Sequence, residues 1–502
     1  MNSVTSTIES YRPAMHYAAR DTWLNDPNGL VFHEGVYHLY YQNNPFGNVH
    51  SNMSWGHATS ADLVSWKEQP VAIPCDDTEE IYSGSIVVDT DNTSGFGTEG
   101  EAPLVAIYTS AYKPGSPHQG TQAQSIAWST DGGYTWTKYA GNPVLTRNSP
   151  EFRDPKVFRY NGPAGSYWVM VAVEAHDFTV LLYRSEDLKN WEYLSTFGPA
   201  NGTGGIWECP DLFELPLDGD AAAMKWVLTV NMNPGGPNGG SAGQYFVGQF
   251  DGVTFSSETT LTEGMQDPER VTDYQWLDWG RDYYAAVSFS NVPDGRRLMI
   301  GWMNNWQYAN HIPTSPWRSP MSLVRDVSLV SVNGKPRLVQ QAAPEVRITS
   351  QPGPFRRMTV DGPTAVEGGA ALQLVDITFT PGSAEEFGLV VRGSADGTVG
   401  TRIGIRPGNG ELIVDRTRSG DIGFHEAFPS TSRAPIAAGP DGSYTLQIFV
   451  DHCSVEVFAN DGLVTMTELI FPGAAQTSLA LYSSGGTADA ALQLTDFGKE
   501  IA

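Results

Sequence analysis

Short apolar runs separated by polar turns extend along almost the whole chain. Segments rich in Val, Ile, Tyr, Phe and Trp alternate with clusters of Gly, Asp, Asn and Pro, as in NGLVFHEGVYHLYYQNNP over residues 28–45. No long segment has the 3.6-residue period of an amphipathic helix. The pattern is typical of many short strands joined by turns, and it predicts an all-β protein.

The strand pattern repeats over the first two thirds of the chain. Each repeat consists of a polar residue, an apolar strand, a turn that contains Gly, and a second strand. Units of this kind predict a five-bladed β-propeller, in which the innermost strand of every blade begins at one central funnel. The repeats begin at Asp26, Ser83, Asp154, Glu208 and Asp282.

A second motif recurs between these repeats. The polar turns SADLVSW, STDGGYTW and SEDLKNW end at Trp66, Trp136 and Trp191. Because the three indoles occupy the same turn context, we expect them to pack in the core between sheets rather than to contact a ligand.

The pattern changes near residue 340. Residues 340–355 (QQAAPEVRITSQPGPF) contain Pro and Gly and lack a strong period, as expected of a linker. Strands then recur about every ten residues with alternating apolar positions, which is typical of an antiparallel β-sandwich. We therefore predict a propeller domain over residues 1–345 and a β-sandwich domain over residues 346–502.

Charge and cysteine content exclude several classes of protein. The formal net charge is −26, a field that repels phosphate groups, so neither nucleic acid nor an anionic membrane surface is an expected partner. Three cysteines (Cys75, Cys209 and Cys453) are too few for a disulfide framework. Since the sequence also lacks CxxC, HExxH and Cys/His clusters, we expect no cofactor and no metal ion.

The sequence contains no apolar run long enough to span a membrane, and its first residues, MNSVTSTIESYRPAMHY, lack the regions of a signal peptide. Two locations stay open. We favour an extracellular protein whose signal peptide is not part of this chain, and the alternative is a cytoplasmic protein. The sequence does not predict the oligomeric state.

Four of the polar residues that open repeats are carboxylic acids, and three of them, Asp26, Asp154 and Glu208, are the candidates for the funnel. Asp26 lies in Asn-Asp-Pro-Asn-Gly, which predicts a tight turn before a hairpin, and Asp before Pro is ordinarily a turn residue. Three acids at equivalent strand starts of a propeller converge, however, and cleavage of a glycosidic bond needs two carboxyl groups flanking it. Aromatic rings that can pack against a sugar are Trp23, Trp55, Tyr82, Trp207 and Trp306.

Two neighbours of Glu208 have less certain roles in the sequence. Cys209 has no obvious His partner that would make it a nucleophile, so we expect a small buried residue that packs beneath the acid. Asp211 fits either a turn residue or a partner of the site, and both interpretations stay open.

Several motifs resemble the signatures of glycoside hydrolase family 32, the β-fructofuranosidases. They are WLNDPNG, FRDP and ECPDLF, supported by YQNNP, SWGHATSADLVSW, YSGS and GWMNNWQYA, and the C-terminal FVDHCSVEVFANDG and ELIFP resemble the family's sandwich domain. The resemblance covers nearly the whole chain. It implies that Asp26 is the nucleophile that forms a covalent fructosyl-enzyme, Glu208 the general acid/base and Asp154 the transition-state stabiliser. It also implies a fructose subsite lined by Asn25, Gln42, Trp55, Ser85 and Arg153, with Trp306 as an aromatic wall.

Three other interpretations compete with this one. STDGGYTW fits a box seen in sialidases, but the sequence lacks the arginine pattern that would bind a substrate carboxylate. An inverting arabinanase or xylosidase has a similar fold with more widely spaced carboxyl groups. A propeller that only binds glycans would need no such trio of acids.

Within the family, sucrose, inulin and levan all present a terminal fructose. We favour sucrose as the substrate, with fructosyl transfer to sugar acceptors at high sugar concentration. The alternative is an exo-acting levanase or inulinase.

Overall fold

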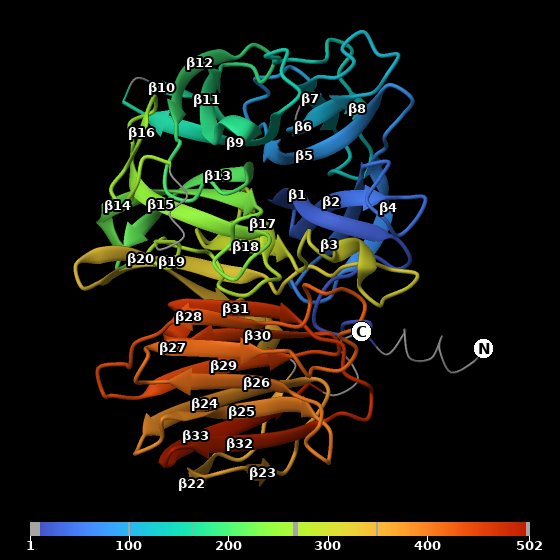
Figure 1. Ribbon diagram of the computed structural model, residues 1–502. Helices are drawn as coiled ribbons and strands as arrows, with labels where there is room; N and C mark the ends of the chain where they lie inside the picture. The colour runs from blue at the N-terminus through green and yellow to red at the C-terminus, as the bar shows by residue number, and fades with distance from the viewer. Residues whose placement is uncertain (1–10, 99–100, 164, 265–269, 348–349, 498–502) are drawn as a thin grey trace.

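The computed structural model describes residues 11–98, 101–163, 165–264, 270–347 and 350–497. Two β-rich domains follow each other along the chain, a propeller coloured blue to yellow and a sandwich coloured orange to red (Figure 1). The predicted all-β propeller followed by a β-sandwich is therefore confirmed.

The described part of the propeller contains five antiparallel units of four strands, which run from the innermost to the outermost strand in chain order. The innermost strands β1, β5, β9, β13 and β17 each contact the next, and β17 contacts β1, so the blades close into a ring. The first blade consists of β1 (Trp23–His33), β2 (Val36–Asn44), β3 (Ser54–Ser60) and β4 (Lys67–Ile73). The second consists of β5 (Glu79–Val88), β6 (Leu104–Tyr112), β7 (Gln122–Ser129) and β8 (Thr137–Lys138). The third consists of β9 (Phe152–Gly162), β10 (Gly165–Glu174), β11 (Thr179–Ser185) and β12 (Glu192–Phe197). The fourth consists of β13 (Ile206–Leu217), β14 (Asp220–Asn233), β15 (Ala242–Phe250) and β16 (Phe255–Ser257). The fifth is β17 (Tyr284–Ser288), β18 (Arg297–Trp302), β19 (Arg325–Val332), β20 (Lys335–Ala342).

Each innermost strand contains a β-bulge near its N-terminal end. The shifted positions include Asp26, Ser83, Asp154, Cys209 and Ala285. A bulge breaks the alternation of side chains and re-aims one of them. The turn predicted around Asp26 is therefore wrong, because β1 runs through this segment and the Asn-Asp-Pro sequence forms a bulge inside the strand.

The three turns that end in Trp connect the third and fourth strands of the first three blades. In each turn the indole nitrogen donates to a backbone carbonyl three residues earlier, at 3.2 Å for Trp66, 3.0 Å for Trp136 and 3.1 Å for Trp191. The rings are half-buried and pack against the apolar blade cores. Their expected role in packing is confirmed.

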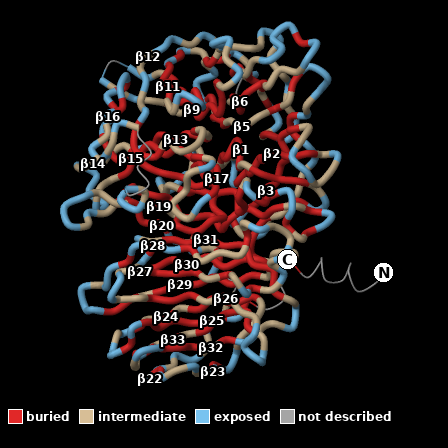
Figure 2. Tube along the Cα trace, in the orientation of Figure 1, coloured by how far each residue is buried: buried red, intermediate tan, exposed pale blue. Residues whose placement is uncertain are grey.

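The C-terminal domain is a sandwich of two antiparallel sheets whose apolar faces form a shared core (Figure 2). One sheet consists of β21 (Gln351–Pro352), β22 (Arg356–Asp361), β24 (Gln373–Pro381), β29 (Tyr444–Val450), β30 (Ser454–Ala459), β31 (Val464–Leu469) and β33 (Thr487–Asp496). The other consists of β23 (Thr364–Val366), β25 (Glu386–Gly393), β26 (Thr401–Arg406), β27 (Glu411–Asp415), β28 (Thr431–Pro435) and β32 (Ser478–Ser484).

Helices are short in the described residues. They are the 3-10 turns η1 (Ala175–Asp177), η2 (Ala309–His311), η3 (Pro344–Arg347) and η4 (Asn460–Gly462). None of these is long or apolar enough to cross a membrane. The predicted domain boundary at residue 345 falls within η3, and residues 348–349 of the predicted linker lie outside the described residues.

Buried ion pairs join the two domains. Arg325 of β19 lies 2.9 Å from Asp278 and 2.7 Å from Glu456 of β30. Arg416, in the turn after β27, lies 2.5 Å from Asp282 of the propeller. Loss of one partner of a buried pair typically costs about 3–5 kcal/mol because the other charge stays buried. These pairs therefore fix how the domains meet.

The segment before the first strand also binds the sandwich. The ring of His16 lies 2.7 Å from Asp451 and 2.9 Å from Glu456, and the backbone N–H of Met15 donates to Asp451 at 2.9 Å. Burial lowers the pKa of His16, but the two carboxylates outweigh it and raise the pKa to about 9. Although the predicted propeller domain began at residue 1, this segment packs against both domains.

Replacing His16 by Gln tests this contact. Since its pKa lies above the ordinary 6.5, His16 contributes stability below pH 6.5 that is lost as the pH rises through about 9. We expect His16→Gln to lower the free energy of unfolding by about 3–5 kcal/mol near pH 6 and by much less above pH 9. Denaturant titrations at both pH values measure this difference, with His118→Gln on an exposed loop as the control. A loss that does not change with pH would contradict the charged His16.

Candidate active site

Asp26 is held at the bulge of β1 by two hydrogen-bond donors. The amide of Asn25 donates to one carboxylate oxygen at 3.0 Å, and the hydroxyl of Ser83 donates to the other at 2.8 Å. The indole N–H of Trp23 donates to the side-chain oxygen of Asn25 at 2.7 Å, which fixes the orientation of the Asn25 amide group. The two donors hold the Asp26 carboxylate in one orientation.

Asp154 is the most enclosed acid of the three. It lies at the bulge of β9 with a φ of 61°, and the backbone N–H of Cys209 donates to its carboxylate at 2.9 Å. Burial raises the pKa of Asp154. The Arg153 guanidinium, 3.8 Å away, opposes this shift, and the charges of Glu208 and Asp26 add to it. The cluster therefore retains a proton more readily than isolated carboxylates would.

Glu208 is partly open to solvent, with a side chain that is 20% exposed. Arg153 donates to one of its oxygens at 3.2 Å, and the hydroxyl of Tyr284 donates to the other at 2.5 Å. Burial and then the charge of Glu208 raise the pKa of Tyr284, so the phenol stays protonated and is a donor. The two donors hold the carboxyl in one orientation.

Cys209 lies between two of the acids. Its Sγ is 3.5 Å from Asp26 Oδ2 and 3.7 Å from Asp154 Oδ2, which brings the bulges of β1, β9 and β13 to one point. Burial, followed by the charges of Asp154, Asp26 and Glu208, raises the pKa of this thiol well above its usual range. A neutral, buried thiol packs between the acids and is not an activated nucleophile.

Three of the predicted lining residues lie behind the acids. Gln42 donates to Asn28 and to the Ile81 carbonyl, both at 3.0 Å. Trp55 is fully buried, and its indole donates to the Tyr82 carbonyl at 3.0 Å. The hydroxyl of Ser85 donates to the Pro155 carbonyl and so ties β5 to β9. In this structure all three support the residues around the funnel, and their predicted contacts with a sugar stay predictions.

The remaining predicted residues lie closer to the acids. Arg153 bridges Asp154 and Glu208 and also pairs with Glu151 at 2.7 Å. Burial and nearby carboxylates, which include Asp154 and Glu208, raise the pKa of Tyr82. Trp306 is partly buried in a stack of indoles, with its ring centre 6.0 Å from that of Trp23. Of the other aromatics considered, Trp23 and Trp207 are fully buried.

The structure adds residues that the sequence did not single out. Ser83, rather than Ser85 of the same YSGS motif, contacts Asp26. Tyr284 occupies the funnel end of the fifth blade, two residues after Asp282, which opens the fifth repeat in the sequence. His50 packs edge-on against Trp306 at 5.1 Å, and burial lowers its pKa although Glu80 and Glu208 oppose the shift. In the sequence, Ser83 could have been identified from its position at a strand start, whereas no pattern marked Tyr284.

Asp211 belongs to the scaffold. It is fully buried, accepts the backbone N–H of Ser288 at 2.7 Å, and lies 3.5 Å from the ammonium of Lys156. It therefore links three blades and is not a turn residue. Among the described residues, no group of three His, Cys, Asp or Glu side chains is arranged to hold a metal ion.

Three carboxyl groups that converge in a propeller funnel indicate a glycoside hydrolase that cleaves its substrate with carboxyl groups. The model of the glycosyl hydrolases family 32 N-terminal domain matches residues 16–342, and that of the family 32 C terminal matches residues 340–496. The chain belongs to glycoside hydrolase family 32 and is an enzyme of the β-fructofuranosidase type. Membership of this family sets aside the sialidase, arabinanase and binding-propeller alternatives.

Individual relatives cover nearly the whole chain. A levanase of Bacillus subtilis is 45% identical over 95% of this chain and 69% of its own length. An extracellular exo-inulinase of Aspergillus niger is 42% identical over 96% of this chain and 93% of its own length. The crystal structure of an exo-inulinase from Aspergillus awamori has a TM-score of 0.92 at 40% identity, covering 97% of this chain and 98% of that one. A β-fructofuranosidase from Schwanniomyces occidentalis, solved in complex with fructosyl-erythritol, has a TM-score of 0.86 at 32% identity and covers 98% of both chains.

The protonated state of Cys209 can be tested by alkylation of the native protein. Because Cys209 and Cys453 are buried with raised pKa values, we expect iodoacetamide to label only the partly exposed Cys75. Mass spectrometry of tryptic peptides measures the labelling, and unfolded protein, in which all three should react, is the control. Rapid labelling of Cys209 with loss of activity would contradict a buried, neutral thiol.

Proposed function

We propose that this protein is an exo-acting fructan hydrolase, which removes terminal β-D-fructofuranosyl residues from levan- or inulin-type chains. The support comes from the gradient of similarity: the levanase and the exo-inulinases are 40–45% identical to this chain, and the β-fructofuranosidase is 32% identical. The sequence predicted a preference for sucrose, and we propose a preference for fructans in its place. Sucrose, which presents the same terminal fructose, is expected as a further substrate.

Asp26 and Glu208 divide the proposed chemistry. An oxygen of Asp26 bonds to the anomeric carbon of fructose while the glycosidic bond breaks, and Glu208 gives its proton to the departing oxygen. Glu208 then takes a proton from a water molecule whose oxygen displaces Asp26. The donors from Asn25 and Ser83 hold the Asp26 carboxylate in one orientation, and the partial exposure of Glu208 suits an acid that exchanges protons with water.

Asp154 and Arg153 complete the proposed mechanism. The transition state carries positive charge on the fructose ring, and a buried acid beside it stabilises that charge without reorganising. Arg153 contacts both Asp154 and Glu208, so it limits the repulsion within the cluster before the substrate binds. An extracellular location is part of the proposal, because the Aspergillus niger relative is named as extracellular.

The proposed roles of Asp26 and Glu208 predict that the two variants lose activity differently when the leaving group of the substrate is changed. We expect Asp26→Asn to lower kcat by about 10³-fold or more on every fructoside. Glu208→Gln should lose about 10²–10⁴-fold on natural substrates, but much less on a fructoside whose leaving group needs no proton. Glu214→Gln, an exposed position on the same strand, is the matched control. Equal losses for both variants on the activated fructoside would refute the assignment of roles.

Substrate preference can be measured by following free glucose and free fructose from sucrose, inulin and levan. We expect fructose release from at least one fructan with a kcat/KM at or above that for sucrose. Cleavage of sucrose with little release from either polymer would restore the preference predicted from the sequence. An excess of glucose over fructose at high sucrose concentration would reveal fructosyl transfer.

A further inference from the structure

The segment that leads into β17 of the fifth blade lies on the edge of the sandwich. The backbone N–H of Trp279 donates to the carbonyl of Thr465 in β31 at 2.8 Å. The backbone N–H of Asp282 donates to the carbonyl of Thr467 at 3.1 Å. Gly280 permits this approach, since a Cβ there would clash with the backbone of Thr467. Because β31 is the edge strand of its sheet, the segment covers backbone groups that would otherwise be open to pairing.

The carboxylate of Asp282 is enclosed at this contact. One of its oxygens accepts the hydroxyl of Tyr308 at 2.6 Å. The other accepts the backbone N–H of Leu469 at 2.8 Å and pairs with the guanidinium of Arg416 at 2.5 Å. Both side chains of the ion pair are 0% exposed. Asp282 is therefore held by both domains, by Tyr308 of the propeller and by Leu469 and Arg416 of the sandwich.

Arg416 is fixed in turn by its surroundings. Its Nε donates to the carbonyl of Phe428 at 2.8 Å, and the guanidinium lies 4.1 Å from the centre of the Phe428 ring. The nitrogen that pairs with Asp282 also lies 2.7 Å from Glu468 of β31. The remaining nitrogen donates to the hydroxyl of Tyr308 at 2.8 Å. These contacts use the planar fork of an arginine, which the ammonium group of a lysine does not reproduce.

This anchor lies close in sequence to the partner of the catalytic acid. β17 begins two residues after Asp282, at Tyr284, and the hydroxyl of Tyr284 donates to Glu208 at 2.5 Å. The ladder between β17 and β18 is interrupted directly after Tyr284, at a bulge where Ala285 has a φ of 53°. The position of Tyr284 therefore depends on the residues before it, and these are the residues that the sandwich holds.

We propose that Arg416 of the sandwich is a positioning residue for catalysis: by fixing Asp282, it holds the hydroxyl of Tyr284 against Glu208. Its effect on the reaction rests on the proposed role of Glu208 as the proton donor. Arg416 acts through this chain of contacts and not by touching the substrate. A misplacement of about 1 Å that arises far from the chemistry can cost about 100-fold in rate, so a looser anchor has a measurable consequence.

Two substitutions loosen the anchor while a similar side chain stays in place. Arg416→Lys retains the positive charge and loses the planar guanidinium. Tyr308→Phe removes the hydroxyl that joins Asp282 to Arg416. Arg392→Lys is the matched control, because Arg392 is also buried and donates to backbone carbonyls within the sandwich.

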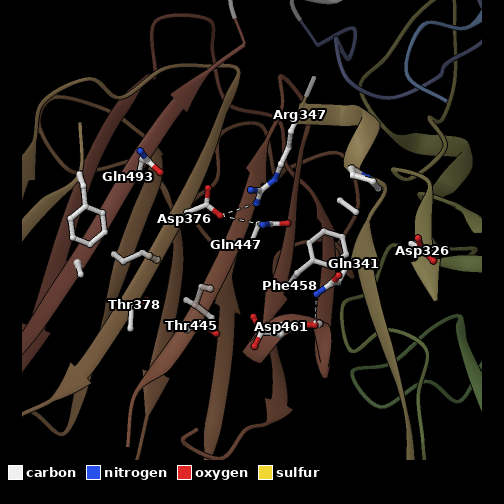
Figure 3. Close-up of a pocket in the computed structure, with 17 residues that line it drawn as sticks. Asp326, Gln341, Arg347, Asp376, Thr378, Thr445, Gln447, Phe458, Asp461 and Gln493 are labelled. Atoms are coloured by element: carbon white, nitrogen blue, oxygen red, sulfur yellow. Dashed lines mark hydrogen bonds and ion pairs between the residues drawn. The ribbon is translucent and has the colours of Figure 1, made fainter. Parts of the chain in front are cut away.

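A second control changes a charge elsewhere at the same junction. A groove with a volume of about 550 Å³ is lined there by residues of both domains. Figure 3 shows Arg347 of η3 beside Asp376 of β24, an ion pair at 3.0 Å whose side chains are 43% and 33% exposed. Because this pair is not on the segment that leads to Tyr284, Asp376→Asn shows whether any loss of charge at the junction changes catalysis.

The measurement is kcat on the natural fructoside that the wild-type enzyme cleaves fastest, at a temperature where melting curves show every variant folded. We expect kcat to fall about three- to tenfold in Arg416→Lys and in Tyr308→Phe. Both losses should shrink on a fructoside whose leaving group needs no proton, because the misplaced acid is then not required. Arg392→Lys and Asp376→Asn should match the wild type on both substrates.

A double-mutant cycle tests whether Arg416 acts through Tyr284. Tyr284→Phe, which lacks the hydroxyl, should lower kcat about tenfold or more, since a hydrogen bond to a charged group is lost. In the Tyr284→Phe protein, Arg416→Lys should cause a further loss of less than about twofold, because no hydroxyl is left to position.

The outcomes separate this proposal from the proposed function. Wild-type kcat in folded Arg416→Lys and Tyr308→Phe proteins would overturn the positioning role, even when Glu208 is the acid. So would a loss in Arg416→Lys that multiplies in full with that of Tyr284→Phe. If Glu208→Gln keeps wild-type activity, the proposed acid is wrong, and a loss shared by Arg416→Lys and Tyr284→Phe would still support positioning of Tyr284 by the sandwich.

Discussion

The repulsion between three carboxyl groups in a confined space is the constraint on which the active site depends. At an effective dielectric constant of about 20, two like charges about 4 Å apart repel by about 4 kcal/mol. Arg153 contacts Asp154 and Glu208, and donors from Asn25, Ser83 and the backbone of Cys209 offset the remaining charge. The raised pKa of Asp154 shows that this compensation is partial. A cluster that retains a proton while one of its members is ionised meets the conflicting needs of an acid and a nucleophile.

Backbone geometry brings the acids together. Regular strands would alternate their side chains between the two faces of each blade, but the bulges turn Asp26 and Asp154 toward the sulfur of Cys209. A proline follows the bulged residue in three of the five innermost strands, at Pro27, Pro155 and Pro210. Proline cannot donate to a β-ladder, so within a sheet it is tolerated at a bulge, where a ladder bond is missing. The Asp-Pro and Cys-Pro pairs therefore belong to the bulges that position the acids.

The sequence predicted what local patterns determine. Strand starts, the turns that end in Trp, and the family motifs identified the propeller, the sandwich and Asp26, Asp154 and Glu208 as a group. It placed Asp26 in a turn because Asn-Asp-Pro-Asn-Gly has the composition of a turn, and only pairing with β2 shows the bulge. The contact of Tyr284 with Glu208 and that of His16 with Asp451 join segments 76 and 435 residues apart. No periodicity or motif specifies such pairs, because they depend on how complete blades and domains pack.

Buried ion pairs fix the junction between the two domains. Arg325 pairs with Glu456 and Arg416 pairs with Asp282 across this junction, so the sandwich and the propeller stay in one relative position. Asp282 lies two residues before Tyr284, and Tyr284 donates to Glu208, so the junction also supports the funnel end of the fifth blade.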